Sequence, residues 1–337
     1  MESKISVTIG IPTYNRLHYL KEAVDSALAQ NYPNIEILIS QNPHRDRLIR
    51  EEIAEYCQGI VSRHRRVRYE LRPHNLGQTG NFQWLVANAH GDYIFLIGDD
   101  DHVAPNGIET LVSALGPDVV LAFGRRQILD ADGRVQPRCV LPDDPDAEFF
   151  SGWPFTQYEV PLGRLADPEL WAWRQAMGVE TSLIRTEDFR RVGYRDLDMP
   201  DLEFFIFLAR EGGRFVFVPE YVSEYRFHMD SSTSRGFNDF RTLFDDLEAL
   251  PVRAEIEPYK RKLLEVIAFK AVSKSLLAGD LHNARRLLAS EYYPAVRTGS
   301  KGLIMKLCAG LPQKIGTGTY NFLYAVKNGR GYRPAGV

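Results

Sequence analysis

The sequence predicts an α/β fold in which a mostly parallel sheet carries helices on both faces, followed by a mainly helical C-terminal region. Short apolar runs alternate with amphipathic stretches over the first 125 residues, the order typical of such sheets. Beyond about residue 237 only helical spacing remains. The 337 residues are 44% hydrophobic and 25% charged, a composition that excludes a mainly disordered chain.

The alternation begins with an apolar run at 5–11, which predicts a buried strand that Pro12 ends. Residues 16–30 follow, with Leu17 and Leu20 at the start of a helical apolar pattern. The same order recurs along the chain, with strands predicted at 35–39, 67–71, 93–97 and 119–123 and helices at 46–62, 79–89 and 107–115.

Residues 130–175 break this rhythm, because they are rich in Pro, Asp and aromatic residues and follow no clean period. We interpret them as an insertion. We expect one domain over 1–235 and a basic, mainly helical extension over 236–337. The pattern after the insertion predicts strands at 177–184 and 215–218 and helices at 201–211, 240–250, 256–277 and 281–288.

Charge is distributed unevenly around a net value of −3. After residue 240, Lys and Arg outnumber Asp and Glu by 16 to 8, and the last 46 residues contain seven basic residues and no acidic one. The acidic remainder argues against nucleic acid as a partner. An anionic partner for the basic tail stays open.

The three cysteines are far apart and form no CxxC pair, which argues against a disulfide framework or a cysteine-rich zinc site. The N-terminus lacks the pattern of a secretory signal. No window approaches the ~18 apolar residues of a membrane span. We therefore expect a cytoplasmic location.

Three adjacent carboxylates, Asp99, Asp100 and Asp101, directly follow the strand predicted at 93–97. Ligands of such sheets bind beyond the carboxyl ends of the strands. Three neighbouring carboxylates repel one another unless a cation or hydrogen-bond donors compensate them. Oxygen ligands of this kind suit Mg²⁺ or Mn²⁺. The alternative is a solvated acidic turn.

Other polar segments follow predicted strands or open predicted helices. The turn 12–16 and the glycine-containing loop 75–81 can bring backbone and side-chain donors to a ligand, or can simply connect a strand to a helix. Asp201 opens a helix, where it is either a capping residue or a general base. His228 is either a ligand or a structural hydrogen-bonding residue.

The order of these pieces resembles the inverting family 2 glycosyltransferases, which have a GT-A, Rossmann-like fold. The likeness runs from about residue 4 to about residue 235. It rests on the ordered segments VTIGIPTYNR, IEILISQN, RPHNLGQTGNFQWLVANAHGDYIFLIGDDD, ETSLIRTEDFRRVGY and MPDLEFFIFLAREGGRFVFVPEYVSEYRFHMDSSTS.

The resemblance implies transfer of a sugar, with inversion, from a nucleotide diphosphate sugar to the hydroxyl of a glycan, a lipid-linked glycan or a small molecule. It implies Mn²⁺ or Mg²⁺ as cofactor and Asp201 as the base. The metal ligands would be Asp100 or Asp101, with His228. The implied nucleotide-sugar site comprises Pro12, Thr13, Tyr14, Asn15, Arg16, Gln41, Asn75, Gly77, Asn81, Asp99 and Asp100.

The sequence departs from the family pattern at two positions. Gln41 stands after the second strand, where the family usually has an Asp that hydrogen-bonds the base. Pro200 replaces the Glu that precedes the catalytic Asp, which makes Glu203 and Asp198 rivals of Asp201 for the role of base.

For the acceptor, we expect the insertion to contribute Trp153, Trp171 and Trp173, with Arg226 nearby; the alternative is that these tryptophans only pack. The basic tail, with the short amphipathic segment KGLIMKLCAGL, can either lie on an anionic membrane or pack on the acidic body. Two other functions stay open: a metal-dependent nucleotidyltransferase and a non-catalytic module that binds nucleotide sugars.

Overall fold

The computed structural model describes residues 5–136, 158–196, 199–228, 240–294 and 299–327. The chain folds as two compact units. The first contains residues 1–196 and 200–235, and the second contains residues 197–199 and 236–337. Each unit is described by itself below.

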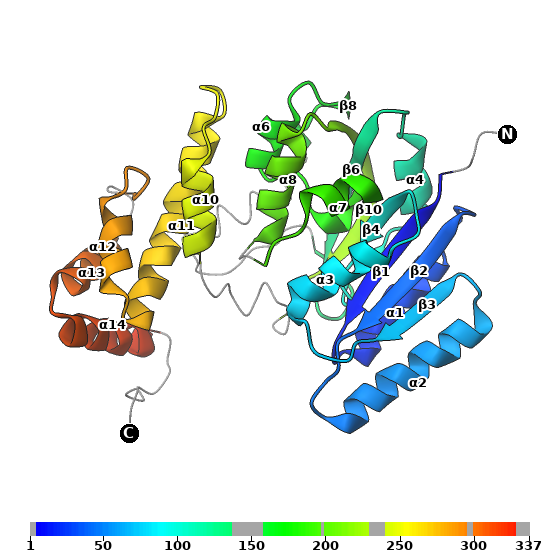
Figure 1. Cartoon of the computed structure of the whole chain (residues 1–337), viewed down its shortest axis with the longest axis horizontal. Coiled ribbons are helices and arrows are strands. Elements are labelled where there is room, and N and C mark those ends of the chain that lie inside the picture. The colour runs from blue at the N-terminus through cyan, green and yellow to red at the C-terminus, as the bar shows by residue number, and fades with distance from the viewer. Residues whose placement is uncertain (1–4, 137–157, 197–198, 229–239, 295–298, 328–337) are drawn as a thin grey trace. The chain divides into compact units, whose positions relative to one another are not determined.

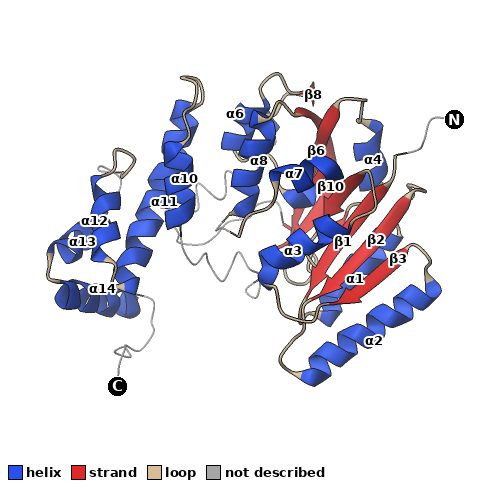
Figure 2. Ribbon diagram, viewed as in Figure 1, coloured by secondary structure: helices blue, strands red, loops and turns tan. Residues whose placement is uncertain are grey.

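The first unit is built around one mixed sheet of ten strands (Figure 2). Its main order is β3-β2-β1-β4-β9-β6-β10-β5, and β7 and β8 pair with β6 and β10. The strands are β1 Val7–Thr13, β2 Ile35–Gln41, β3 Val67–Leu71, β4 Tyr93–Leu96, β5 His102–Val103, β6 Val119–Leu129, β7 Val135–Gln136, β8 Gly163–Arg164, β9 Ser182–Arg185 and β10 Arg214–Arg226.

The longer strands of this sheet run in one direction. β1 pairs in parallel with β2 and β4, β2 with β3, and β6 with β10. The short β9 lies antiparallel between β4 and β6 and so leaves those two in the same direction. The carboxyl ends of β1, β2, β3 and β4 therefore meet at one edge, as the predicted fold requires.

Helices cover both faces of the sheet (Figure 1). Alternate residues of the central strands, such as Ile9 and Phe95, share an apolar core with residues of α1, α2 and α4. The opposite face of β1 is so close to α3 that a Cβ on Gly10 would meet Leu96 and Leu85. The helices of this unit are α1 Leu17–Leu28, α2 Arg47–Arg63, α3 Gly77–Asn88, α4 Gly107–Ser113, α6 Pro168–Trp173, α7 Thr186–Val192 and α8 Pro200–Arg210.

The structure extends or redivides several predicted elements. β6 and β10 are much longer than the predicted 119–123 and 215–218, because the two strands stay paired beyond Phe123, across irregularities in register after Phe217 and Tyr221. The strand predicted at 177–184 begins as a 3-10 turn, Val179–Thr181, before β9. The helices α6 and α7 were not predicted from the sequence.

The second unit is helical, as predicted. Its helices are α10 Arg241–Ala249, α11 Glu257–Ala278, α12 Leu281–Ala289, α13 Gly299–Gly310 and α14 Gln313–Lys327. The sequence patterns indicated the first three but not α13 and α14 as full helices. Among the described helices, none combines the length and the apolar character that crossing a membrane requires.

Gly91 joins α3 to β4 at a point where backbones nearly touch. A Cβ there would lie 2.4 Å from Thr8 N and 2.7 Å from Tyr93 O. Gly91 N also donates to Thr8 Oγ1 (2.8 Å), and its carbonyl accepts from Thr186 Oγ1 (2.7 Å). No side chain can be accommodated without shifting β1 or β4.

We therefore expect Gly91→Ala to lower the free energy of unfolding by about 1–3 kcal/mol or more, the usual cost of overpacking. The matched control is Gly59→Ala, in the middle of α2, where the nearest heavy atom is the end of the Arg63 side chain at 4.0 Å. That change should stabilise by about 0.5–1 kcal/mol, because alanine favours helix. Urea unfolding measures both, and equal midpoints would contradict the argument.

Candidate functional site

The acidic triplet follows β4 and faces the turn that follows β1. Thr13 Oγ1 donates to Asp99 Oδ2 at 2.8 Å. The Arg16 guanidinium pairs with the carboxylates of both Asp99 and Asp100, the latter at 2.6 Å. Asp99 is buried. The triplet is therefore not a solvated turn, because an arginine and a hydroxyl compensate its charge.

His228 completes this group from the end of β10. Its Nε2 lies 2.9 Å from Asp100 Oδ2 and 3.3 Å from Arg16 Nη1. The ring packs against Tyr19 of α1, with centroids 4.9 Å apart, and is buried. Residues from three distant segments of the chain thus meet at one carboxylate oxygen of Asp100.

Arg226 holds the third carboxylate and the turn itself. Its backbone N–H donates to Asp101 Oδ1 (2.9 Å) and its Nε to the carbonyl of Asp100 (3.0 Å). The guanidinium reaches Glu22 and His102. Arg226 is 2% exposed, so it supports the acidic turn from within the protein. This placement differs from the expected contact with an acceptor.

The three neighbouring carboxylates have different pKa shifts. Burial raises the pKa of Asp99, against the charge of Arg16. Burial and the charge of Asp100 raise the pKa of Asp101 well above its usual value. Burial acts in the same direction on Asp100, but the hydrogen bond from His228 and the charge of Arg16 outweigh it and lower the pKa. Asp100 is therefore the member of the triplet most firmly held as an anion.

Asp201 is the second residue of α8 and is fixed at both oxygens. Val179 N donates to Oδ2 (3.2 Å) and the Tyr194 hydroxyl donates to Oδ1. Burial and the charge of Glu180 raise the pKa of Asp201 to about 6. Its carboxylate is thus oriented and more basic than an ordinary aspartate.

The buried ion pair between Arg126 of β6 and Glu180 lies beside Asp201. Glu180 raises the pKa of Asp201, and Arg126 acts in the opposite direction. No sequence pattern indicates either residue, since Glu180 lies in the segment predicted to be a strand. The only signal in the sequence was a charged residue, Glu180, inside the strand predicted at 177–184.

The rivals of Asp201 are less suited to act as a base. Glu203 is buried and pairs with Arg195 at 2.9 Å. Asp198 lies outside the described residues. Pro200, which replaces the family's usual Glu, is the first residue of α8.

The predicted nucleotide residues beyond this group divide into two kinds. Gln41 is fully buried; its amide N–H donates to Arg50 O, and its amide oxygen accepts from Tyr69 Oη. Asn81 is also buried and donates to Ser40 O. These contacts favour a structural role for both residues. Asn15 and Asn75 are exposed. Pro12 lies within β1, Gly77 opens α3 with a φ of 72°, and Tyr14 packs on His44 with ring centroids 4.8 Å apart.

Three buried polar atoms, two near the ends of β2 and β3 and one on α3 beside them, have no hydrogen-bond partner among the described residues. They are Ser40 Oγ, Asn81 Oδ1 and Arg72 Nε. Buried groups of this kind are rare in proteins unless a water or ligand satisfies them. They adjoin the turn after β1, since Thr13 is paired in register with Gln41.

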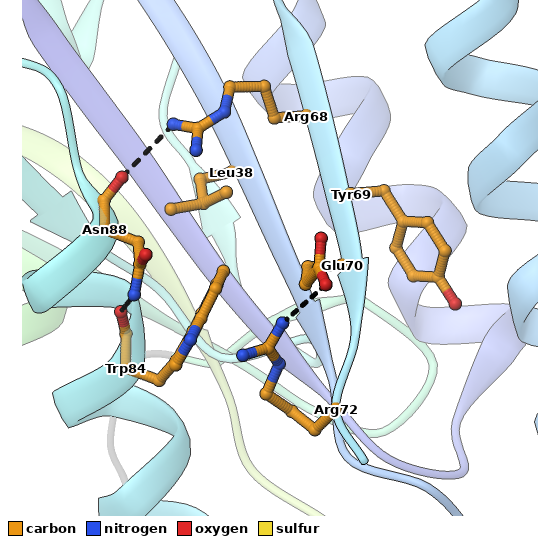
Figure 3. Close-up of a pocket in the computed structure, with 7 residues that line it drawn as sticks. All are labelled: Leu38, Arg68, Tyr69, Glu70, Arg72, Trp84 and Asn88. Atoms are coloured by element: carbon orange, nitrogen blue, oxygen red, sulfur yellow. Dashed lines mark hydrogen bonds and ion pairs between the residues drawn. The ribbon is translucent and has the colours of Figure 1, made fainter.

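A cavity of about 350 Å³ opens between β2, β3 and α3. Figure 3 shows Trp84 of α3 facing the guanidinium of Arg72, which is 3.6 Å from the ring centroid, and shows Arg68 and Glu70 along β3. Arg68 bonds Asn88 O at 3.1 Å, and Arg72 pairs with Glu70 at 3.1 Å. The lining does not include the acidic triplet or Asp201.

The two described tryptophans of the predicted insertion are buried. Trp171 is 7% and Trp173 is 1% exposed, both in α6, which packs on α8. Their burial favours the packing interpretation over contact with an acceptor. Trp153 lies outside the described residues.

Comparison with known proteins finds similarity to glycosyltransferases. Residues 8–158 match the family model described as glycosyl transferase family 2. An uncharacterized glycosyltransferase of Rickettsia felis is 33% identical over 144 residues, which are 40% of this chain and 23% of that protein. The chain thus spans only about a quarter of this relative. Glycosyltransferase GlyG of Streptococcus pneumoniae is 26% identical over 282 residues, 81% of each chain.

Two solved structures share the fold at low sequence identity. S. aureus TarS residues 1–349 in complex with UDP has a TM-score of 0.57 at 12% identity, covering 99% of this chain and 94% of that one. The mannosyltransferase PcManGT of Pyrobaculum calidifontis, in complex with GDP-Man and Mn²⁺, has a TM-score of 0.53 at 16% identity, covering 97% and 88%. The predicted resemblance and fold are confirmed: residues 8–158 are similar to glycosyl transferase family 2, and the chain shares the GT-A fold of these structures.

Proposed function

We propose that this chain transfers a sugar from a nucleotide diphosphate sugar to an acceptor hydroxyl with inversion. Asp201 is the base, and Asp100 with His228 holds a divalent cation. The observation that carries the proposal is the convergence of Thr13, Arg16, Asp100 and His228 at the carboxyl edge of the sheet. In the same unit Asp201 has a raised pKa. The match of residues 8–158 to the family model supports the same reaction class.

The donor atoms present suit a divalent cation. Asp100 Oδ2 and His228 Nε2 are 2.9 Å apart, and a positive guanidinium nitrogen, Arg16 Nη1, already lies 2.6 Å from the first and 3.3 Å from the second. The carboxylate oxygen suits Mn²⁺ or Mg²⁺, whereas an imidazole nitrogen is typical of transition-metal sites, so the pair favours Mn²⁺ of the two. Asp100 is the better candidate than Asp101, because its pKa is lowered rather than raised.

Within the described ranges, no three His, Cys, Asp or Glu side chains are grouped to hold a metal ion by themselves. A site with only two protein donors fits an ion that also takes oxygens from a substrate diphosphate and water. Such an ion, when bound, supplies charge stabilisation to the departing nucleoside diphosphate. Arg16 supplies positive charge at the same edge of the site.

Asp201 has the properties that deprotonation of an acceptor hydroxyl requires. A pKa of about 6 leaves it ionised at neutral pH yet basic enough to accept a proton. Val179 N and Tyr194 Oη fix its orientation. A base of this kind contributes typically ~10²–10⁴-fold to the rate. Attack from the face opposite the leaving group gives inversion.

The nucleotide lies, in this proposal, over the turn 13–16 and the ends of β2 and β3. Tyr14 with His44 offers an aromatic wall there. The unpartnered atoms Ser40 Oγ and Arg72 Nε offer hydrogen bonds to a base. Structures of the neighbours TarS with UDP-GlcNAc and PcManGT with GDP-Man are consistent with a nucleotide sugar as donor.

A panel of nucleotide sugars tests donor and metal together. With Mn²⁺ present, the true donor should raise the melting temperature by mass action, and EDTA should abolish this shift. Asp100→Asn should raise, by about tenfold or more, the donor concentration that gives the same Mn²⁺-dependent shift in melting temperature. Asp132→Asn, at an exposed side chain in the same unit, is the control.

Asp201→Asn should retain the donor-induced shift but lose about 10²–10⁴-fold in transfer rate, measured as release of nucleoside diphosphate. Release of pyrophosphate instead would identify a nucleotidyltransferase. Donor binding without any turnover, and with no effect of Asp201→Asn, would identify a non-catalytic binding module.

The pH dependence tests the base separately. Burial and the charge of Glu180 raise the pKa of Asp201. The hydrogen bond from Tyr194 and the charge of Arg126 lower it. Tyr194→Phe removes one lowering contribution, so the pKa should rise above its value of about 6. The acidic limb of the kcat/KM profile should then move to higher pH.

At pH 6 the parent, with a pKa of about 6, should run at about half its rate at pH 8. The variant should lose more than that, about tenfold if its pKa rises by one unit. Tyr221→Phe, at an exposed tyrosine, should leave the limb unchanged. A limb that stays in place or moves to lower pH in Tyr194→Phe would rule out Asp201 as the titrating base.

A further inference from the structure

The second unit exposes a row of large apolar side chains on each of its last two helices. On α13, Leu303 and Leu307 are four residues apart and are 59% and 62% exposed. On α14, Ile315, Phe322 and Val326 are exposed, the last to 62%. Spacings of four and seven residues place each row on one face of its helix.

The opposite faces of these helices are well packed. Met305 and Cys308 of α13 and Tyr320 of α14 are buried. Tyr320 Oη is 2.6 Å from Ser273 Oγ of α11. A Cβ on Gly316 would lie 2.2 Å from Cys308 O, so the two helices touch closely. Each helix therefore packs through one face and exposes its apolar row on the opposite face.

The charged residues of α13 and α14 are all basic. No acidic residue follows Glu291 in the sequence. Lys306 stands beside Leu307 on α13, and Lys314 stands beside Ile315 at the start of α14; both lysines are exposed. A second copy of this chain would bring the same positive charges to the same apolar rows. Two helices that expose apolar rows and whose own charged residues are all basic instead complement an anionic lipid surface.

We propose that α13 and α14 bind the surface of an anionic membrane, with Leu303, Leu307, Phe322 and Val326 entering the headgroup region and the lysines facing lipid phosphates. The helices have 12 and 15 residues, fewer than the ~20 that span a bilayer, so they lie on the surface. The proposal stands on the second unit alone and does not depend on the transferase reaction.

Co-sedimentation of the full chain with vesicles tests it. Vesicles of phosphatidylglycerol and phosphatidylcholine should bind the chain at least tenfold more tightly than phosphatidylcholine alone, and salt should weaken the binding. The double variant Phe322→Ser, Val326→Ser and the double variant Lys306→Glu, Lys314→Glu should each lose about tenfold or more. Leu48→Ser, at a 70% exposed leucine of α2, should bind like the parent.

Circular dichroism and donor-induced thermal shifts show whether each variant is folded. Absence of binding by the parent chain at physiological salt would overturn the proposal. So would equal binding by all variants, or a concentration-dependent dimer that Phe322→Ser abolishes, which would identify a second copy as the partner. None of these outcomes bears on the proposed transfer reaction, which is measured without vesicles.

Discussion

The first unit depends on the compensation of three consecutive carboxylates at the end of β4. Their mutual repulsion and the loss of water on burial would make this turn unstable by itself. Two arginines from distant parts of the chain compensate them, one by its charge and the other by hydrogen bonds. Arg16, after β1, pairs with Asp99 and Asp100. Arg226, at the end of β10, holds the backbone of Asp100 and the carboxylate of Asp101. The sheet order brings these ends together.

The acidic site could be predicted because its signals are local. A run of Asp directly after an apolar strand, and polar residues directly after another, indicate an edge of a parallel sheet whatever the rest of the chain does. The order of the segments then indicated the resemblance to family 2 glycosyltransferases. The role of Arg226 could not be predicted in this way, since its partners Glu22 and Asp101 are separated from it by about two hundred and over one hundred residues. Only the folded β10 brings them into contact.

Elements were missed where tertiary packing overrides local preference. Glycines at 316 and 318 weaken the helical signal of α14. Yet the residue at 316 must lack a side chain for α14 to approach Cys308. Glu180 was missed for a related reason. Its 3-10 turn lies in a run that is apolar enough to be taken for a strand, and its charge is balanced by Arg126 of β6, which no sequence pattern connects to it.

Aspartates with the same intrinsic acidity acquire opposite properties in this fold. Burial raises the pKa of Asp100, but a nearby imidazole and guanidinium more than offset that effect and hold the side chain as an anion. Among the described residues, the charge of Arg126 opposes burial of Asp201 only in part. The hydrogen bonds that Asp201 accepts from Val179 and Tyr194 also only partly oppose burial and the charge of Glu180, so it becomes more basic. In the proposed function, this separation of the two pKa values assigns cation binding to Asp100 and proton transfer to Asp201. The division follows from which strand ends supply cations. The turn after β1 and the end of β10 supply them to Asp100, whereas the start of α8 receives the negative charge of Glu180.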